Sequence, residues 1–157
     1  MNFRLGTKED ILQIEKPLKS SWMMHVDKAS GYINPAAFEN FSLDEYFKDC
    51  FNESGKAYLL IAEEDGKIAG FAKVNLQDIQ SFFVQKKVLY IDDIYTMESF
   101  RNRGVGSSLL KEAEKLAIEK NVKWLKARIY SFNKPSQGMF ESAGYENLYS
   151  EYFRRLD

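Results

Sequence analysis

The chain is poor in the residues that build metal centres and disulfide frameworks. Its 157 residues include one cysteine, Cys50, and one histidine, His25. A single cysteine cannot form an internal disulfide, which fits a reducing compartment. No group of His, Cys, Asp and Glu has the spacing of metal ligands, so we expect no metal. Because Cys50 lies in an apolar helical context, we interpret it as a buried structural thiol and not as a nucleophile.

Long apolar runs are also lacking. No segment approaches the ~18 uninterrupted apolar residues of a membrane helix, and residues 1–6 lack the apolar core of a signal peptide. A basic stripe with interleaved aromatic residues, typical of nucleic-acid binding, is absent as well. We therefore expect a cytoplasmic protein whose partners are neither membranes nor nucleic acids.

The chain has enough apolar material for one core. It is 45% hydrophobic and 15% aromatic, and it is about one domain long, so we expect a single domain spanning residues 1–157. Residues 1–100 carry 16 acidic and 11 basic residues, whereas residues 101–157 carry 7 and 11. This asymmetry favours an anionic ligand held by the second part and a cationic one admitted by the first.

Strand patterns recur along the chain. They lie at residues 3–6, 57–62, 67–74, 88–96, 124–130 and, as a strand or hairpin, 146–156. Asp65-Gly66 is a hairpin turn signal, so the second and third strands should be antiparallel neighbours.

Helix start signals separate these strands. Thr7 and Asp10 form a capping box before the first helix, which Pro17 should break or kink. Further starts lie at Asn34-Pro35, Ser42, Gly104 and Pro135. The resulting order, β-α-α-β-β-β-α-β-α-β, predicts one mixed sheet covered by helices.

The segment 99–110 follows a strand pattern and opens a helical one. Within six residues it supplies two arginines, Arg101 and Arg103, and two glycines, Gly104 and Gly106. A helix N-terminus has unpaired N–H groups and a positive dipole end, and glycine lets a ligand approach the backbone closely. The loop therefore predicts a pyrophosphate site.

Two common nucleotide motifs do not fit this loop. A P-loop requires Lys-Ser/Thr directly after its last glycine, and Gly106 is followed by Ser107-Ser108. A dinucleotide fingerprint requires a third glycine three residues after the second, where this chain has Leu109, and it lies at the first strand-helix turn of its domain.

The pattern that remains is Arg-x-x-Gly-x-Gly, followed by Asn133 and by Phe-Glu-Ser-Ala-Gly-Tyr at residues 140–145. It resembles the GNAT superfamily of N-acetyltransferases, and the run 89–97 is most similar to the diamine (spermidine/spermine-type) branch. The resemblance implies an α+β fold with one mixed, mostly antiparallel sheet of about six to seven strands and helices on both faces.

The resemblance also implies acetyl-CoA as co-substrate. The pyrophosphate would lie at residues 101–108, the pantetheine arm would pair with the backbone at residues 94–96, and Asn133 and Phe140 would lie near the thiol end. The implied contacts are Ile94, Tyr95, Thr96, Arg101, Asn102, Arg103, Gly104, Val105, Gly106, Ser107, Ser108, Asn133 and Phe140.

Acetyl transfer to an amine requires a group that accepts the amine's proton. The carboxylates of Asp92 and Asp93 would attract a protonated amine, and one of them could accept its proton directly or through water. Because strand side chains alternate, we expect only one of the pair to face the cleft, and the resemblance favours Asp92. The alternative is a structural pair that bonds nearby Arg or Lys or caps a bulge.

Phe140 departs from the family pattern, in which a tyrosine at this point is the usual donor of a proton to the CoA thiolate. Here Tyr130 or Tyr145 would serve, or water would, because a thiolate with a pKa of about 8.5 is a tolerable leaving group. Trp22 and His25 lie where the superfamily usually lines its acceptor site, so the resemblance makes them candidate substrate contacts; the alternative for His25 is a solvated loop histidine.

These features predict an acetyl-CoA-dependent N-acetyltransferase acting on a primary amine, most plausibly a small cationic metabolite such as a polyamine. A peptide or protein lysine or N-terminus is the second candidate acceptor, and a non-catalytic acyl-CoA-binding module is a third reading. The aromatic tail 149–153 could pair in a homodimer.

Overall fold

The computed structural model describes residues 1–29, 31–39, 41–154 and 156. Five strands form one sheet in the order β1-β2-β3-β4-β5, antiparallel except for the parallel β4–β5 pair. The strands are β1 (Asn2–Leu5), β2 (Ala57–Glu64), β3 (Lys67–Asp78), β4 (Lys87–Thr96) and β5 (Leu125–Ala127). The expected α+β class and mixed, mostly antiparallel sheet are therefore confirmed.

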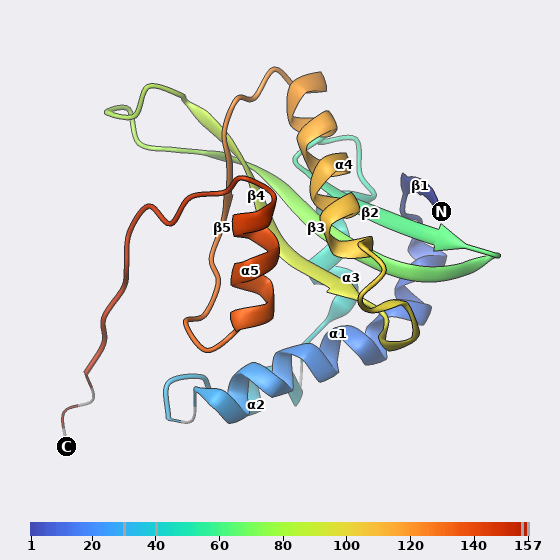
Figure 1. Ribbon diagram of the computed structural model, residues 1–157, viewed down its shortest axis with the longest axis horizontal. Helices are drawn as coiled ribbons and strands as arrows, with labels where there is room; N and C mark the ends of the chain where they lie inside the picture. Colours follow the sequence, from blue (N-terminus) through green and yellow to red (C-terminus); the bar gives the residue numbers. More distant parts are fainter. Residues whose placement is uncertain (30, 40, 155, 157) are drawn as a thin grey trace.

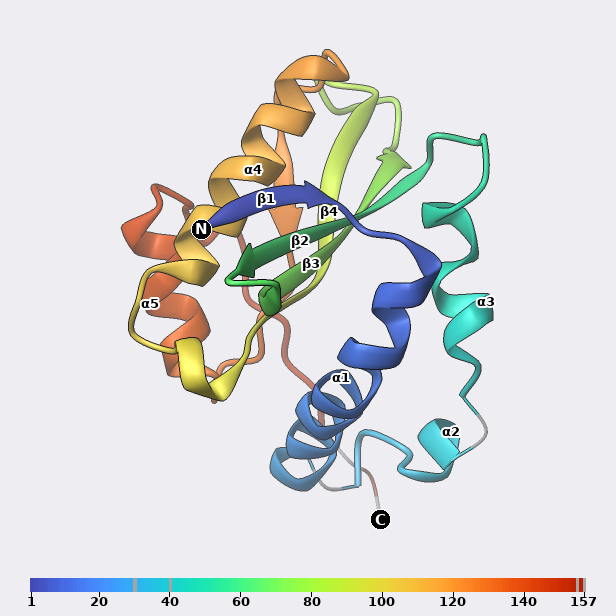
Figure 2. The same cartoon turned by 90° about the vertical axis from the view of Figure 1, so that its right-hand side faces the viewer.

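Helices cover both faces of this sheet (Figures 1 and 2). On one face lie α4 (Val105–Glu119) and α5 (Lys134–Ser142), and on the other lie α1 (Lys8–Lys28) and α3 (Leu43–Phe47). The remaining short elements are α2 (Ala36–Glu39) and the 3-10 turns η1 (Lys48–Cys50) and η2 (Glu98–Phe100). No helix in the described ranges is long and apolar enough to cross a membrane.

The strand pattern creates two cores because successive side chains point to opposite faces. On the α4 face, Ala72, Val74, Leu89 and Ile91 pack against the helix stripe of Leu109, Leu110 and Ala113. On the α1 face, Leu59, Ile61 and Phe71 pack against Ile14, Leu18 and Phe47. Both layers are thus held by apolar burial.

The local signals for helix and turn starts are confirmed. The Thr7 backbone N–H donates to the Asp10 carboxylate at 2.8 Å, and Ser42 Oγ accepts from the Glu45 N–H at 3.2 Å. Asp65 and Gly66 both have positive φ, +52° and +72°, as a type I′ hairpin turn requires.

Pro17 does not end the first helix, because α1 continues through it. Proline removes one backbone donor and crowds the preceding turn. Ile14 and Leu18 on either side are fully buried against the sheet, and this packing holds the helix on both sides of the proline.

The expected count of six to seven strands is wrong, since the sheet has five. The pattern at 124–130 forms only β5, three residues long, and the described residues of 146–156 carry no strand. In that tail Leu148, Tyr152 and Leu156 are exposed, so β-forming side chains there have no packed face that would stabilise a strand. The tail extends away from the sheet in Figure 1.

Candidate functional site

A cleft forms where β4 and β5 part. The two strands pair only from Leu89 opposite Leu125 to Ile91 opposite Ala127, and β4 then continues alone on that side to Thr96. Across residues 94–96 the β5-facing edge of β4 has no strand partner in the described part of the chain. An extended ligand can therefore pair with this backbone as an added strand would.

The cleft gathers residues from α1, β4, the β5 strand and α5. Its lining consists of Ser21, His25, Ile91, Asp92, Asp93, Ile94, Ala127, Arg128, Ile129, Tyr130, Asn133, Ser136 and Phe140. Seven residues predicted from the sequence are thus brought together: His25, Asp92, Asp93, Ile94, Tyr130, Asn133 and Phe140. Trp22, Tyr95, Thr96, Tyr145 and residues 101–108 do not line it.

A β-bulge changes the expected placement of the two aspartates. Lys73 pairs with Asp93 but Val74 pairs with Ile91, so Asp92 is an extra residue in β4. The bulge breaks the alternation of side chains, and both carboxylates contact groups on the α1 face of the sheet. The strict alternation from which we expected only one of them to face the cleft therefore does not hold at this pair, and both residues belong to the cleft lining.

Asp92 is paired within the protein. Its Oδ2 accepts from Lys73 Nζ at 2.8 Å and from Asn75 Nδ2, both on β3. The Lys73 ammonium also lies 3.7 Å from the centre of the Tyr46 ring, in a cation–π contact. Asp92 thus forms an ion pair with a nearby lysine, which is the structural role that the sequence analysis gave as the alternative to catalysis.

Asp93 has two other partners. Its Oδ1 accepts from Trp22 Nε1 at 3.0 Å, and its Oδ2 accepts from the Tyr46 hydroxyl. Burial raises the pKa of Asp93, and these two hydrogen bonds oppose the shift. Burial and the neighbouring carboxylate raise the pKa of Tyr46, so its hydroxyl stays protonated and donates to Asp93.

Trp22, expected to contact substrate, is instead part of the packing between helices. Its ring contacts those of Phe38, Phe41 and Tyr46 at centroid distances of 4.8 to 5.6 Å, and its N–H is used by Asp93. Trp22 thus orients the carboxylate of Asp93 but does not itself line the cleft.

His25 lies at the mouth of the cleft. Its Nδ1–H donates to the Ser21 carbonyl at 2.8 Å, one turn back in α1, which leaves Nε2 available as an acceptor. The imidazole lies 5.2 Å from the Tyr130 ring, and Tyr130 stacks on Phe132 at 5.1 Å. His25 and Tyr130 thus line the cleft together with the two aspartates, and Phe132 packs against both rings.

The other predicted phenol lies away from the cleft. Tyr145 packs edge-on against Phe140 at 4.9 Å, and its hydroxyl is buried with no hydrogen-bond partner in the described residues. Burial raises the pKa of Tyr145. Asn133 begins α5, where its Oδ1 accepts from the Ser136 N–H at 3.3 Å.

The loop before α4 has the backbone that anion binding requires. Asn102 and Gly104 have φ of +60° and +75°, and Gly104 is the N-cap of α4. The first N–H groups of the helix have no carbonyl one turn back, so they are available to a phosphate. Arg101 and Arg103 are exposed beside them, held loosely by Glu98 at 3.7 Å and more closely by Glu64 at 2.5 Å. The loop therefore fits a pyrophosphate.

Gly106 has a packing reason in addition. A Cβ built there would lie 2.4 Å from Met139 Sδ on α5. Its small size thus brings α4 and α5 together at the edge of the cleft, and a bulky residue at 106 would disturb this packing as well as ligand binding.

Sequence reasoning missed Tyr46, Lys73 and Asn75. Lys73 and Asn75 alternate with apolar residues in β3, and a charged residue inside so apolar a strand was the available signal. Tyr46 gave no such signal, because its contact with Asp93 crosses 47 positions of sequence.

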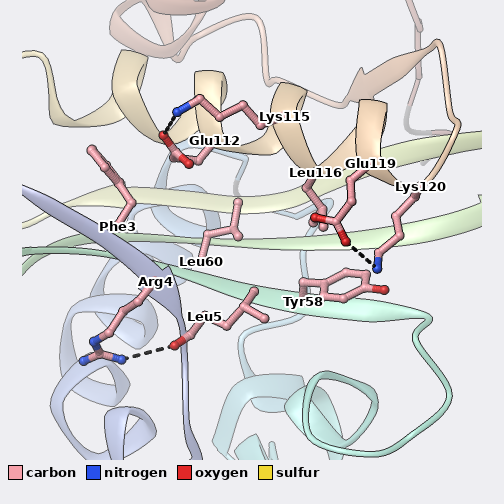
Figure 3. A pocket seen from close by; sticks show the side chains of 10 residues that line it. All are labelled: Phe3, Arg4, Leu5, Tyr58, Leu60, Glu112, Lys115, Leu116, Glu119 and Lys120. Carbon is pink, nitrogen blue, oxygen red and sulfur yellow. Dashed lines mark hydrogen bonds and ion pairs between the residues drawn. The ribbon is translucent and has the colours of Figure 1, made fainter.

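A second hollow lies at the β1 edge of the sheet, which is the edge opposite β5. It is formed between β1, β2 and α4 (Figure 3). Phe3, Leu60 and Leu116 form its apolar part, and the ion pairs Glu112–Lys115 and Glu119–Lys120 lie along its rim. None of the site residues predicted from the sequence lines it. In the described ranges no cluster of His, Cys, Asp and Glu could hold a metal.

The sequence profile of the Acetyltransferase (GNAT) family matches residues 22–145. The chain therefore belongs to this family of acetyltransferases. An uncharacterized N-acetyltransferase of Bacillus subtilis, YhfO, is 26% identical over 146 residues, 93% of this chain and 90% of YhfO. A human spermidine/spermine N(1)-acetyltransferase-like protein 1 is 25% identical over 68% of this chain and 16% of its own length.

Solved structures share the fold. A mutant of the BH1408 protein of Bacillus halodurans has a TM-score of 0.86 at 18% identity, with 99% of both chains covered. The aminoglycoside N-acetyltransferase AAC(6')-Iy, solved in complex with CoA, has a TM-score of 0.69 at 20% identity, with 99% of both chains covered.

Proposed function

We propose that this acetyltransferase transfers the acetyl group of acetyl-CoA directly to the primary amine of a small cationic metabolite, such as a polyamine. The observation that carries the proposal is the pair of carboxylates, Asp92 and Asp93, side by side in the cleft wall. With one ammonium, Lys73, among them, the cluster has one negative charge in excess when both acids are ionised. Such a cluster attracts a protonated amine.

The donor would be held by the loop and the free edge of β4. Arg101, Arg103 and the N–H groups at the start of α4 would bind the pyrophosphate. The backbone at residues 94–96 would pair with the pantetheine arm. The acetyl thioester supplies the activated acyl group, and its carbonyl would be polarised by a backbone N–H near residues 95–97.

Asp92 is the better candidate to accept the amine's proton. Lys73 and Asn75 both donate to Oδ2 of Asp92, so Oδ1 has no partner in the described residues and is available to an amine or a water. In Asp93 each carboxylate oxygen already accepts a hydrogen bond. Asp93 would therefore contribute charge and hold Trp22 and Tyr46 in place.

Tyr130, which lines the cleft, or a water would return a proton to the CoA thiolate. The raised pKa and buried position of Tyr145 make it a poorer acid for this step. Two names among the similar proteins support an amine acceptor: spermidine/spermine for the human relative and aminoglycoside for the CoA complex.

The test is release of free CoA from acetyl-CoA in the presence of polyamines, aminoglycosides and lysine peptides. We expect the highest kcat/KM with polyamines and a loss of at least about a hundredfold in Asp92→Asn. Asp78→Asn, an exposed acid on β3, is the matched control and should behave as the wild type. A preference for lysine peptides would contradict the small-molecule acceptor, and an absence of amine-dependent release would contradict catalysis on amines altogether.

Two further expectations belong to this proposal. A homodimer would have twice the 18.3 kDa mass of the chain, which light scattering after gel filtration would measure. Cytoplasmic location is the second, and fractionation of cells that express the protein tests it.

A further inference from the structure

Lys73 is a buried cation in the middle of a strand. Its relative exposure is 6%, and its neighbours Phe71 and Val74 are fully buried. An ammonium in such a position loses most of its hydration, which is unfavourable unless the charge is paired. Its presence beside the catalytic cleft therefore calls for an explanation beyond packing.

The surroundings of this ammonium are those that a protein offers to an amine ligand. A carboxylate oxygen of Asp92 lies 2.8 Å from Lys73 Nζ, and the centre of the Tyr46 ring lies 3.7 Å from it. The Asn75 amide donates a hydrogen bond to the same carboxylate oxygen. Carboxylates and aromatic faces are the common partners of substrate ammonium groups. The side chain of Lys73 thus occupies a ready-made ammonium site in the wall of the cleft.

The charge of the cleft follows from a short inventory. When both acids are ionised, Asp92 and Asp93 contribute two negative charges, and Lys73 contributes one positive charge. Of the remaining lining groups that can carry charge, Arg128 is largely exposed and lies 3.8 Å from Glu151, and His25 lies on α1. The acceptor therefore meets a cluster with one negative charge in excess.

We propose that Lys73 is a specificity-determining residue that limits how much positive charge an acceptor can bring to the cleft. This inference rests on the proposed function, in which the acceptor is an amine. The lysine fills the position that a second substrate ammonium would take at Asp92. The cleft then favours acceptors that place one ammonium group near Asp92. Any second cationic group of the acceptor would lie outside this part of the cleft.

The experiment compares the affinities of two probe amines, butylamine and putrescine, which have the same chain length and differ by one ammonium. Their Kd values are measured by calorimetry in the presence of CoA at mildly alkaline pH, where binding needs no turnover. Lys73→Met removes the one positive charge of the cluster, so its excess of negative charge rises by one. We expect the ratio of Kd for butylamine to Kd for putrescine to rise about tenfold, because an unpaired, partly buried carboxylate favours a second cation.

Lys67→Met is the matched control, since it removes an exposed lysine from the same strand and should leave the ratio unchanged. If Lys73→Met does not fold, Lys73→Met/Asp92→Asn removes both members of the ion pair and is compared with Asp92→Asn alone. These two variants differ only in the charge of Lys73, and the double variant should show the higher ratio. The proposed role of Lys73 is overturned if the ratio is the same in Lys73→Met as in the wild type and the same in the double variant as in Asp92→Asn.

The two proposals fail in different ways. A wild-type protein that releases no CoA with any amine contradicts the proposed function, whereas the Kd ratios still report on Lys73. Normal turnover with an unchanged ratio overturns the inference about Lys73 and leaves the proposed function intact.

Discussion

Asp92 and Asp93 are neighbours in sequence but have different partners. Asp92 pairs with Lys73 and Asn75 through one oxygen, whereas Asp93 uses both oxygens toward Trp22 and Tyr46. Cys50, by contrast, acts as a small apolar residue, since burial raises the pKa of its thiol to about 11. Its reading as a structural thiol agrees with this shift, because a thiol protonated at neutral pH is a poor nucleophile.

The ion pair between the buried Asp10 and the partly exposed Arg4 gives a prediction on stability. Arg4 donates to both Asp10 oxygens at 2.7 and 2.9 Å, and these bonds lower the pKa of Asp10. A lowered folded-state pKa stabilises the fold above the unfolded-state pKa, and this stabilisation is lost as pH falls through the folded value. Because Arg4 is partly exposed and solvent screens the pair, Asp10→Asn should lower the free energy of unfolding by about 1 to 2 kcal/mol near neutral pH.

Urea unfolding at several pH values measures this effect. The difference between Asp10→Asn and the wild type should shrink as the pH falls below about 4. Asp27→Asn, exposed on the same helix, should show no comparable loss at any pH. A difference that is constant from neutral to acid pH would mean that the charge of Asp10 is not what stabilises the protein.

At the scale of elements, short-range rules explain most starts and turns. The capping box of α1, the N-cap serine of α3, and the hairpin turn at Asp65-Gly66 are where local chemistry predicts them. Packing overrides local rules at Pro17, where the helix continues, and in the tail, whose described residues form no strand. Elements thus follow propensity unless burial against the sheet favours another outcome.

Two glycines test backbone conformation without side-chain contacts. A Cβ at Gly66 or at Gly138 would meet no atom within 4 Å, but Gly66 has a φ of +72° and Gly138 lies within α5. Gly138→Ala should raise the free energy of unfolding by about 0.5 to 1 kcal/mol, because alanine favours the helix. Gly66→Ala should lower it by about 1 to 2 kcal/mol, because an L-residue is strained at positive φ. Urea unfolding measures both, and shifts of the same sign would contradict this account.

At the scale of the molecule, the cleft results from how the layers are joined. The α4 core holds β4 against the helix that follows the arginine loop, and β5 leaves β4 after three paired residues. The arginine-glycine loop before α4 and the carboxylate cluster thereby lie at the two ends of the same free strand edge. The proposed donor and acceptor would meet along β4.

Acetyl-CoA binding should therefore stabilise the whole fold. A ligand at about 100 times its Kd adds about 2.7 kcal/mol to stability, and each tenfold loss of affinity removes about 1.4 kcal/mol of this. Arg101→Ala removes an exposed guanidinium whose nearest acid is 3.7 Å away, so its effect on the free protein should be small. We expect Arg101→Ala to reduce the rise in Tm on adding acetyl-CoA by about half.

The control for this measurement is Lys111→Ala, an exposed lysine one to two turns into α4. It should leave the acetyl-CoA-dependent rise in Tm as in the wild type. Equal rises in Arg101→Ala and Lys111→Ala would mean that Arg101 takes no part in binding the pyrophosphate.

Local patterns in the sequence were sufficient for the starts of α1 and α3, the hairpin, and the arginine-glycine loop before α4, whereas the predicted order has two helices where the structure has α1, α2 and α3 before β2. These features depend on residues within about one turn of each other, where capping, positive φ and side-chain period decide the outcome. The same reasoning placed Asp92, His25, Tyr130 and Asn133 among candidate residues, and they do line one cleft.

Only the tertiary structure decided which groups surround the two aspartates. The bulge at Asp92 depends on pairing with β3, and the contacts of Asp93 join α1 and α3 to β4 across 71 and 47 positions of sequence. The burial of Lys73 and the missing last strand depend likewise on what packs against them. The spacing of residues in the sequence does not predict such contacts, because each depends on the register between strands and on burial between layers.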